Sequence, residues 1–165
     1  YARKYIGTPY RRGSKGPNRF DCSGFMQYIF NHFSYSLNAS SASQYLQGIS
    51  VKDEEICRGD LVFFKGRNSR RSNVGHVGLV TEVYPDGRFK FIHTSTSQGI
   101  REDWNFSPYY AQRYVGARRI YFVQIDKRLI LDAILELEDI DDNTPFTETE
   151  KSITPQEFST FVRAE

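Results

Sequence analysis

The chain has 165 residues, of which 39% are hydrophobic and 15% aromatic, so a single domain can bury a sizeable core. The sequence has no run of about 18 apolar residues, so we do not expect a membrane-spanning helix. The start at Tyr1 shows no intact signal peptide and allows for a leader that has been removed. Two cysteines, Cys22 and Cys57, are too few for a disulfide scaffold.

Charge divides the chain into two parts. Residues 1–125 contain 18 Lys and Arg against 9 Asp and Glu, a balance of +9, whereas residues 126–165 contain 4 against 11, a balance of −7. A basic part suits an anionic polymer, whether nucleic acid or a cell-wall glycan with free carboxylates. Its basic residues are scattered and no nucleic-acid-binding motif surrounds them, so an ordinary solvated basic surface is an equally good interpretation.

The first predicted element is an amphipathic helix that begins near Cys22. Its apolar positions recur at steps of three and four residues, namely Cys22, Met26, Ile29, Phe30 and Phe33. Asp21 stands at the N-cap position, which places Cys22 in the first turn. Unpaired backbone N–H groups and about half a positive charge at a helix start favour a thiolate, so we expect Cys22 to be a poised nucleophile. Cys57, in "EEICRGDLVFF", is expected to be a buried filler before the first strand.

Three strands are predicted next, over residues 60–65, 76–84 and 88–95, and consecutive short strands favour an antiparallel sheet. Beyond them, "IDKRLILDAILELEDI" fits a strand or a helix, and the polar, proline-containing end that follows is typical of a linker. We therefore expect one domain over residues 1–125 and an acidic, in part disordered extension over residues 126–165. A docking arm, a lid and a disordered end are all open interpretations of that extension.

A thiol nucleophile needs a base, and the chain offers three histidines. His32 lies ten residues beyond Cys22 on the same predicted helix, roughly 15 Å along its axis, and is expected to be a surface residue. His76 opens "GHVGLV" on a predicted strand, and a strand-borne imidazole facing a helix-borne thiol is typical of a cysteine hydrolase. His93, in "KFIHTSTS" on the next strand, can fix the tautomer of His76. A lone histidine is more often structural, but this combination favours catalysis.

The spacing of His76 and His93 constrains the turn between their strands. A two-residue turn at Asp86 and Gly87 would pair His93 with Val80, about 13 Å along the strand from His76. That distance excludes a hydrogen bond between the two rings. We therefore predict a longer or bulged connection that sets His76 opposite His93.

Four blocks of the sequence, lying within residues 3–120, resemble the NlpC-type papain-like peptidases of bacterial cell walls, the NlpC/p-sixty family. They occur in the family's order and are "GTPYRRGSKGPNRFDCSGFMQYIF", "GDLVFF", "GHVGLV" and "FIHTSTSQGI", and "RYVGARRI" resembles the close of that domain. The resemblance implies an α+β, papain-like NlpC-type fold with N-terminal helices packed on a central antiparallel β-sheet. It also implies that Cys22 is the nucleophile, His76 the base and His93 the third, orienting residue.

Three further residues carry over by motif. Tyr10 matches the tyrosine of the family's "PY" segment, whose hydroxyl lies beside the thiol, and it would help the Cys22 backbone N–H to hold the oxyanion. Asp21 and Ser23 match the family's "DCSG" and would contact the substrate, Ser23 near its free amine or amide. An N-cap role alone is as good an interpretation of Asp21, and a packing role alone is an alternative for Tyr10.

The resemblance implies a peptidoglycan hydrolase that acts as a cysteine endopeptidase on stem-peptide amide bonds, with no cofactor and no metal. Members usually cut between D-glutamate and a diamino acid such as meso-diaminopimelate, and a branch with a strand similar to "FIHTSTSQGI" cuts the D-alanyl cross-link instead. Both bonds stay open, with the first as the default.

Peptidoglycan stem peptides are the expected partners and nucleic acid is not, while the oligomeric state is not predicted. The expected location is outside the cytoplasm, in the periplasm or cell envelope, with lipid anchoring through a removed N-terminus as one option. Two other classes remain open: a non-catalytic wall-binding module, and a thiol acyltransferase or amidase of the same fold.

Overall fold

A computed structural model describes residues 1–66 and 73–121, so the predicted extension over residues 126–165 lies outside the described residues. Its elements, in chain order, are η1 (Ala2–Tyr5), α1 (Cys22–His32), α2 (Ser41–Gln44), β1 (Ile49–Val51), η2 (Asp53–Glu55), β2 (Leu61–Lys65), β3 (Val74–Val83), β4 (Phe89–Ser95), β5 (Gly99–Trp104), α3 (Pro108–Ala111) and β6 (Tyr114–Arg119). None of the helices in these two ranges is long and apolar enough to cross a membrane.

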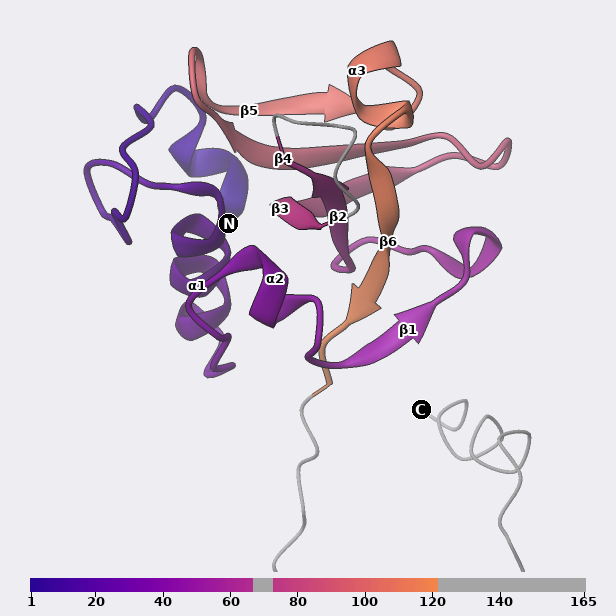
Figure 1. Ribbon diagram of the computed structural model, residues 1–165, viewed down its shortest axis with the longest axis horizontal. Coiled ribbons are helices and arrows are strands. Elements are labelled where there is room, and N and C mark those ends of the chain that lie inside the picture. The colour runs from indigo at the N-terminus through magenta and orange to yellow at the C-terminus, as the bar shows by residue number, and fades with distance from the viewer. Residues whose placement is uncertain (67–72, 122–165) are drawn as a thin grey trace, which may run out of the picture. The chain divides into compact units, whose positions relative to one another are not determined.

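The six strands form one sheet in the order β1-β6-β2-β3-β4-β5, and every pairing in it is antiparallel. Helix α1 packs against β3 and β4, and α2 packs against β3, while α3 precedes β6 (Figure 1). The expected α+β architecture, with N-terminal helices on a central antiparallel sheet, is confirmed. The three predicted strands match β2, β3 and β4, although β3 begins two residues earlier than expected.

Side chains from both faces of the sheet are buried, which explains the continuous apolar run of β2. Successive side chains of a strand point to opposite faces. Leu61 and Phe63 join the core beneath α1, whereas Val62 and Phe64 join a second core with Tyr110. The sheet is therefore held between two apolar layers.

Helix α1 begins where the sequence predicts. The Asp21 side chain accepts a hydrogen bond from the Gly24 N–H at 2.6 Å, as an N-cap does. The helix ends at His32, and Phe33, expected on the apolar stripe, lies beyond its end and is 55% exposed. The next residue, Ser34, has a positive φ of 64°, which helical geometry does not allow.

The connection between β3 and β4 is longer and more irregular than a two-residue turn, as predicted. The Tyr84 N–H donates to the Arg88 carbonyl at 2.8 Å, which closes a three-residue loop in which Gly87 has a φ of +80°. A bulge between Val80 and Glu82 shifts the register once more. The loop and the bulge each move the pairing by one residue.

The resulting register pairs His93 with Gly78. The expected pairing of His76 directly opposite His93 is therefore wrong by two residues. Because residues two apart on a strand point to the same face, His76 and His93 are diagonal neighbours on one face of the sheet, close enough for their rings to meet.

Cys57 is exposed, so the expectation of a buried filler is wrong. The chain turns just before β2, and the buried positions of this turn go to Ile56 and Asp60. Asp60 is 1% exposed, accepts a hydrogen bond from the Cys57 N–H and pairs with Arg119. The carboxylate of Asp60 thus takes the inward place and the Cys57 side chain faces outward.

Candidate active site

Cys22 is a half-buried free cysteine at the first position of α1. Backbone N–H groups of Ser23, of Val77 and of Cys22 itself face the thiol closely enough to act on its pKa, each in the lowering direction. Val77 lies on β3 directly after His76. The thiol therefore sits between the start of the helix and the part of β3 that carries the expected base.

The segment before α1 folds back on itself and fixes the helix start. The Arg11 N–H donates to the Phe20 carbonyl and the Phe20 N–H to the Pro9 carbonyl, so Tyr10 lies alongside the residues that lead into Cys22. Tyr10 is half-buried there. Its role at the oxyanion stays a prediction.

Asp21 and Ser23 form a hydrogen-bonded unit. One Asp21 carboxylate oxygen accepts from the Gly24 N–H at 2.6 Å and from the Ser23 hydroxyl at 3.2 Å, and the other accepts from the Gly13 N–H at 2.8 Å. Ser23 is only 7% exposed. These bonds give Asp21 a structural role in joining the loop to the helix, and the substrate contacts expected of both residues stay predictions.

A chain of hydrogen bonds runs from His76 across the sheet. His76 Nε2 lies 3.0 Å from His93 Nδ1, and His93 Nε2 lies 2.9 Å from a carboxylate oxygen of Asp103. The other oxygen of Asp103 accepts from Arg101 at 2.5 Å, and the Tyr110 hydroxyl lies 3.2 Å from His93 Nε2. The structure thus brings the two predicted histidines together and adds three residues that sequence reasoning missed.

The register of β4 and β5 explains why Asp103 meets His93. Arg101 lies directly opposite His93, and Asp103, two residues further along β5, is its diagonal neighbour on the same face. The sequence carries no periodic signal for this strand, because polar and apolar residues do not alternate in "GIREDW", and nothing in that run specifies the strand with which it pairs.

The carboxylate fixes the positions of the protons along this chain. Burial works to raise the pKa of Asp103, but the hydrogen bond to His93 and the charge of Arg101 lower it below its ordinary value. An ionised carboxylate can only accept, so His93 carries its proton on Nε2 and accepts on Nδ1. His76 then donates from Nε2, which leaves Nδ1 as the ring nitrogen able to accept the thiol proton.

The thiol and the imidazole are both neutral over a wide pH range. Burial raises the pKa of Cys22 to about 11, assisted by the charge of Asp21, and the nearby backbone N–H groups, which lower it, do not compensate. Burial also lowers the pKa of His76 to about 3, with a further contribution from His93. Desolvation therefore opposes the helix terminus, which by itself favours a thiolate, and the net shift of the Cys22 pKa is upward.

The apolar surroundings of the histidines account for this desolvation. The rings of Phe64 and Tyr110 lie 6.1 and 6.5 Å from His76, and the rings of Phe91 and Tyr110 lie 5.1 and 5.2 Å from His93. His93 itself is fully buried. A water molecule therefore has little room to replace a lost partner of this ring.

The other predicted histidine has no part in this arrangement. His32 is exposed and stacks on Tyr1 with a centroid separation of 3.8 Å, as a surface residue can. Within residues 1–66 and 73–121, no group of three His, Cys, Asp or Glu side chains could hold a metal ion.

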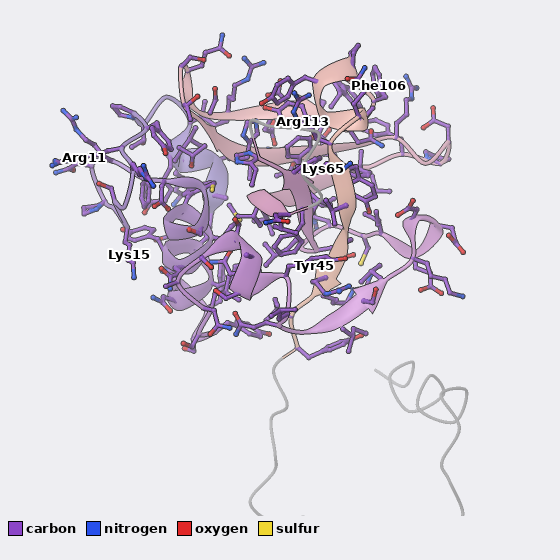
Figure 2. The ribbon with its side chains drawn as sticks, viewed as in Figure 1. Arg11, Lys15, Tyr45, Lys65, Phe106 and Arg113 are labelled. Carbon is purple, nitrogen blue, oxygen red and sulfur yellow. The ribbon has the colours of Figure 1, made fainter. Side chains whose placement is uncertain are left out.

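A cavity of about 340 Å³ opens beside the histidine pair. Its lining includes His76, His93, Lys65 and Arg113, and Figure 2 labels the last two, at the end of β2 and ahead of β6.

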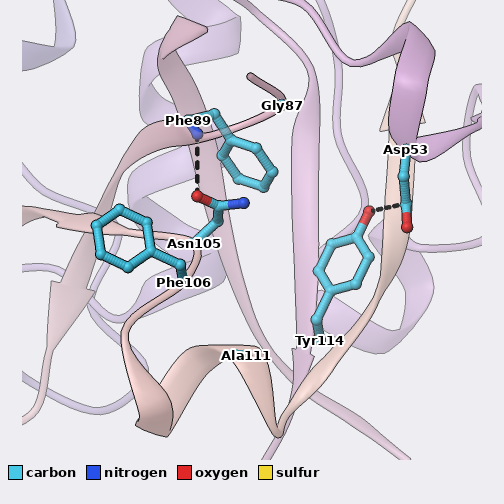
Figure 3. A pocket seen from close by; sticks show the side chains of 7 residues that line it. All are labelled: Asp53, Gly87, Phe89, Asn105, Phe106, Ala111 and Tyr114. Atoms are coloured by element: carbon cyan, nitrogen blue, oxygen red, sulfur yellow. Dashed lines mark hydrogen bonds between the residues drawn. The ribbon is translucent and has the colours of Figure 1, made fainter. Parts of the chain in front are cut away.

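A second cavity, of about 320 Å³, is shown in Figure 3. There the Tyr114 hydroxyl donates to Asp53 and the Phe89 N–H donates to Asn105, each at 2.9 Å, so these polar groups satisfy one another. Its lining contains no histidine, whereas that of the first cavity contains His76 and His93, and we place the candidate chemistry beside the first cavity.

A sequence model of the NlpC/P60 family matches residues 7–119, more than half of the chain. The chain belongs to the NlpC/P60 family. The matched range contains the cysteine, both histidines and the whole described sheet. Family membership, expected from four sequence blocks, is therefore confirmed.

Two curated relatives show the range of this family. The Murein DD-endopeptidase MepS/Murein LD-carboxypeptidase of Escherichia coli K12 is 36% identical, over 69% of this chain and 56% of its own length. The Gamma-DL-glutamyl hydrolase of Bacillus subtilis 168 is 34% identical, over 72% of this chain and 28% of its own length. The chain thus spans about half or less of these NlpC/P60 relatives.

The fold agrees with that of a solved NlpC/P60 protein. The crystal structure of an NlpC/P60 family protein from Bacillus cereus ATCC 10987 superposes with a TM-score of 0.64 and is 28% identical, over 72% of this chain and 37% of that one. The NlpC-type, papain-like α+β fold expected from the sequence is confirmed.

Proposed function

We propose that this chain is a peptidoglycan hydrolase, a cysteine endopeptidase that cleaves stem-peptide amide bonds with Cys22 as nucleophile and His76 as base. The observation that carries the proposal is the hydrogen-bonded chain from His76 through His93 to Asp103, next to a cysteine at a helix start. A base with a fixed tautomer and a nearby nucleophile are what acyl transfer requires. The names of the two relatives, an endopeptidase and a hydrolase, support the same class.

The reaction would start from the neutral pair. As the sulfur of Cys22 attacks the carbonyl carbon of the scissile amide, its proton passes to Nδ1 of His76, and the C–S bond forms. The Cys22 N–H and the hydroxyl of Tyr10 would hold the oxyanion. His76 then gives the proton to the leaving nitrogen, the C–N bond breaks, and a water molecule, deprotonated by His76, hydrolyses the thioester to release a carboxylic acid and the thiol.

His93 and Asp103 would act through His76. The imidazolium that forms during attack is disfavoured in its buried position, as the lowered pKa of His76 indicates. The half-buried Asp103 carboxylate, joined to it through His93, offsets part of this cost at the moment when the charge develops.

Two scissile bonds remain candidates. The bond between D-glutamate and a diamino acid is the default, in line with the name of the B. subtilis relative, and the D-alanyl cross-link is the alternative, in line with the name of the E. coli relative. Either substrate implies an exported protein that faces the cell wall.

The test uses purified peptidoglycan fragments, cross-linked and monomeric, with product masses as the readout. We expect new amino termini with the wild-type chain and with the Cys57→Ser variant, which keeps Cys22. We expect none with the Cys22→Ala variant. The two cysteine variants form a matched pair, since Cys57 is exposed and does not line the cavity beside the histidines. Cleavage retained by Cys22→Ala would refute the nucleophile. Wall binding without cleavage by any variant would indicate a binding module, and transfer to an added amine in place of hydrolysis would indicate an acyltransferase.

A further inference from the structure

The cavity beside the histidines lies on one particular side of the reaction centre. Its lining contains His76 and His93 but not Cys22 or the residues of α1. The base must touch the leaving nitrogen in order to protonate it. The part of the substrate that leaves as the amine must therefore lie next to His76. This cavity is the space beside His76.

Two cationic side chains line the cavity, and no carboxylate among the described residues pairs with either. They are Lys65, at the end of β2, and Arg113, just before β6. A backbone hydrogen bond from the Lys65 N–H to the Arg113 carbonyl, at 2.7 Å, holds the two residues next to each other (Figure 2). Asp103, the carboxylate of the histidine chain, is paired with Arg101 and His93.

Arg113 is held in place before any ligand arrives. Its guanidinium carbon lies 3.8 Å from the centroid of the Tyr109 ring, and its Nη1 donates to the Tyr109 carbonyl at 3.0 Å. Its Nε is buried and makes no hydrogen bond. A fixed guanidinium with an unused donor is suited to a carboxylate, which it can bind with two parallel N–H···O bonds.

The unpaired Nε of Arg113 calls for a partner, because buried polar atoms are nearly always paired. Ser95, Thr96 and Ser97 complete this part of the lining, so the cavity has a polar wall beside its two cations.

We propose that this cavity binds a free carboxylate on the substrate residue that departs as the amine, with Lys65 and Arg113 as the residues that determine this specificity. The inference rests on the proposed function, because that function defines which side is the amine side. The volume of about 340 Å³ is at the lower end of the range for small-ligand sites, roughly 300–1,000 Å³, and is sufficient for one amino-acid residue.

The test compares two synthetic stem peptides that differ at one group. In one the amine-side diamino acid has a free carboxylate, and in the other the same group is a carboxamide. Losing a charge-assisted hydrogen bond lowers affinity about tenfold or more, so kcat/KM of the wild-type chain should favour the carboxylate peptide by about tenfold. Arg113→Gln and, independently, Lys65→Met should each reduce this ratio, whereas Arg113→Lys should keep part of it.

The control variant is Lys52→Met, which removes an exposed charge far along the chain from the cavity lining. It should leave the ratio as in the wild type. A wild-type ratio near one, or a ratio that survives both Arg113→Gln and Lys65→Met, would overturn the inference.

Failure of the proposed function can be told apart from failure of this inference. If the wild type cleaves neither peptide and leaves cross-linked peptidoglycan fragments intact as well, the hydrolase is refuted. The preference is then read from calorimetric binding of the free amine-side fragments, carboxylate against carboxamide, to the same protein. Tighter binding of the carboxylate fragment that Arg113→Gln removes would keep the site, and equal binding of the two fragments would refute it.

Discussion

Replacing Asp103 by Asn should reverse the proton positions along the histidine pair. Asp103 accepts from both Arg101 and His93. An Asn side chain has one oxygen and one NH₂ group, and because Arg101 can only donate, the oxygen must turn to Arg101 and the NH₂ group to His93. His93 then accepts on Nε2 and donates from Nδ1, so His76 must accept on Nε2 and carry its proton on Nδ1, where it can no longer take the proton of Cys22.

The size of the effect follows from the burial of this chain. The hydrogen bond between His93 and Asp103 is 2.9 Å long, and the two side chains are 0% and 15% exposed, so water cannot replace the carboxylate. A charge-assisted hydrogen bond contributes about 1.5–3 kcal/mol, and the reversed tautomer adds to its loss. We therefore expect kcat/KM to fall about 100-fold or more, with the fold and the melting temperature largely kept.

The assay measures initial rates of amide hydrolysis on a stem peptide for the wild type, Asp103→Asn and the double variant Asp103→Asn with Arg101→Met. Without Arg101, the Asn can turn its oxygen to His93 and restore the original tautomers, so the double variant should be faster than the single one. Asp86→Asn, at an exposed ion pair in the β3–β4 loop, is the control and should match the wild type. The reasoning would be refuted if Asp103→Asn hydrolysed the peptide within a factor of about three of the wild-type rate, far short of the expected loss. It would also be refuted if the double variant were slower than the single one.

Further predictions concern the thiol and the helix start. The pKa of Cys22 is raised to about 11, so its alkylation rate by iodoacetamide should rise about tenfold per pH unit between pH 6 and 9, and a plateau in that range would show a preformed thiolate. Asp21→Ala removes three hydrogen bonds and should lower the free energy of unfolding by about 2 kcal/mol in urea titrations, whereas an unchanged midpoint would contradict the N-cap role. Gly24→Ala would place a Cβ 2.3 Å from the Ser14 carbonyl oxygen and should cost about 1–3 kcal/mol by the same measurement, with a neutral result showing that the loop can retreat. Cys57→Ser, at an exposed position, should change that midpoint by less than about 0.5 kcal/mol, and a larger loss would mean that its thiol is buried in solution.

The features that sequence predicts best here are local ones. The start of α1 depends on Asp21 and the next three residues, which are adjacent in the chain, and the structure has the helix where the N-cap pattern places it. Strands β2, β3 and β4 can be predicted from short apolar runs, because such a run fits a strand whose side chains are buried on both faces of the sheet. Family motifs identified the cysteine and the two histidines for the same reason, since each motif is a contiguous run.

The features that sequence could not supply are those set by pairing between distant segments. The three-residue loop and the bulge after Val80 together shift His93 by two residues, and no residue type in that stretch specifies the bulge. Asp103 enters the site through the pairing of β5 with β4, so it becomes visible only when the register is known. Cys57 faces outward because Asp60 is required inside to meet Arg119, a contact between residues far apart in the chain.

The raised pKa of Cys22 connects these observations to the chemistry. A helix terminus alone would favour a thiolate, but the sulfur is packed against β3 and close to the Asp21 carboxylate, and the net effect has the opposite sign. Under the proposed function, the charge separation that attack requires is created during the reaction, and the Asp103 carboxylate stabilises it from the other side through His93 and His76. It follows that residues of β5, far along the chain from the nucleophile, should affect the rate more strongly than substitutions that only alter the partial charge of the α1 terminus.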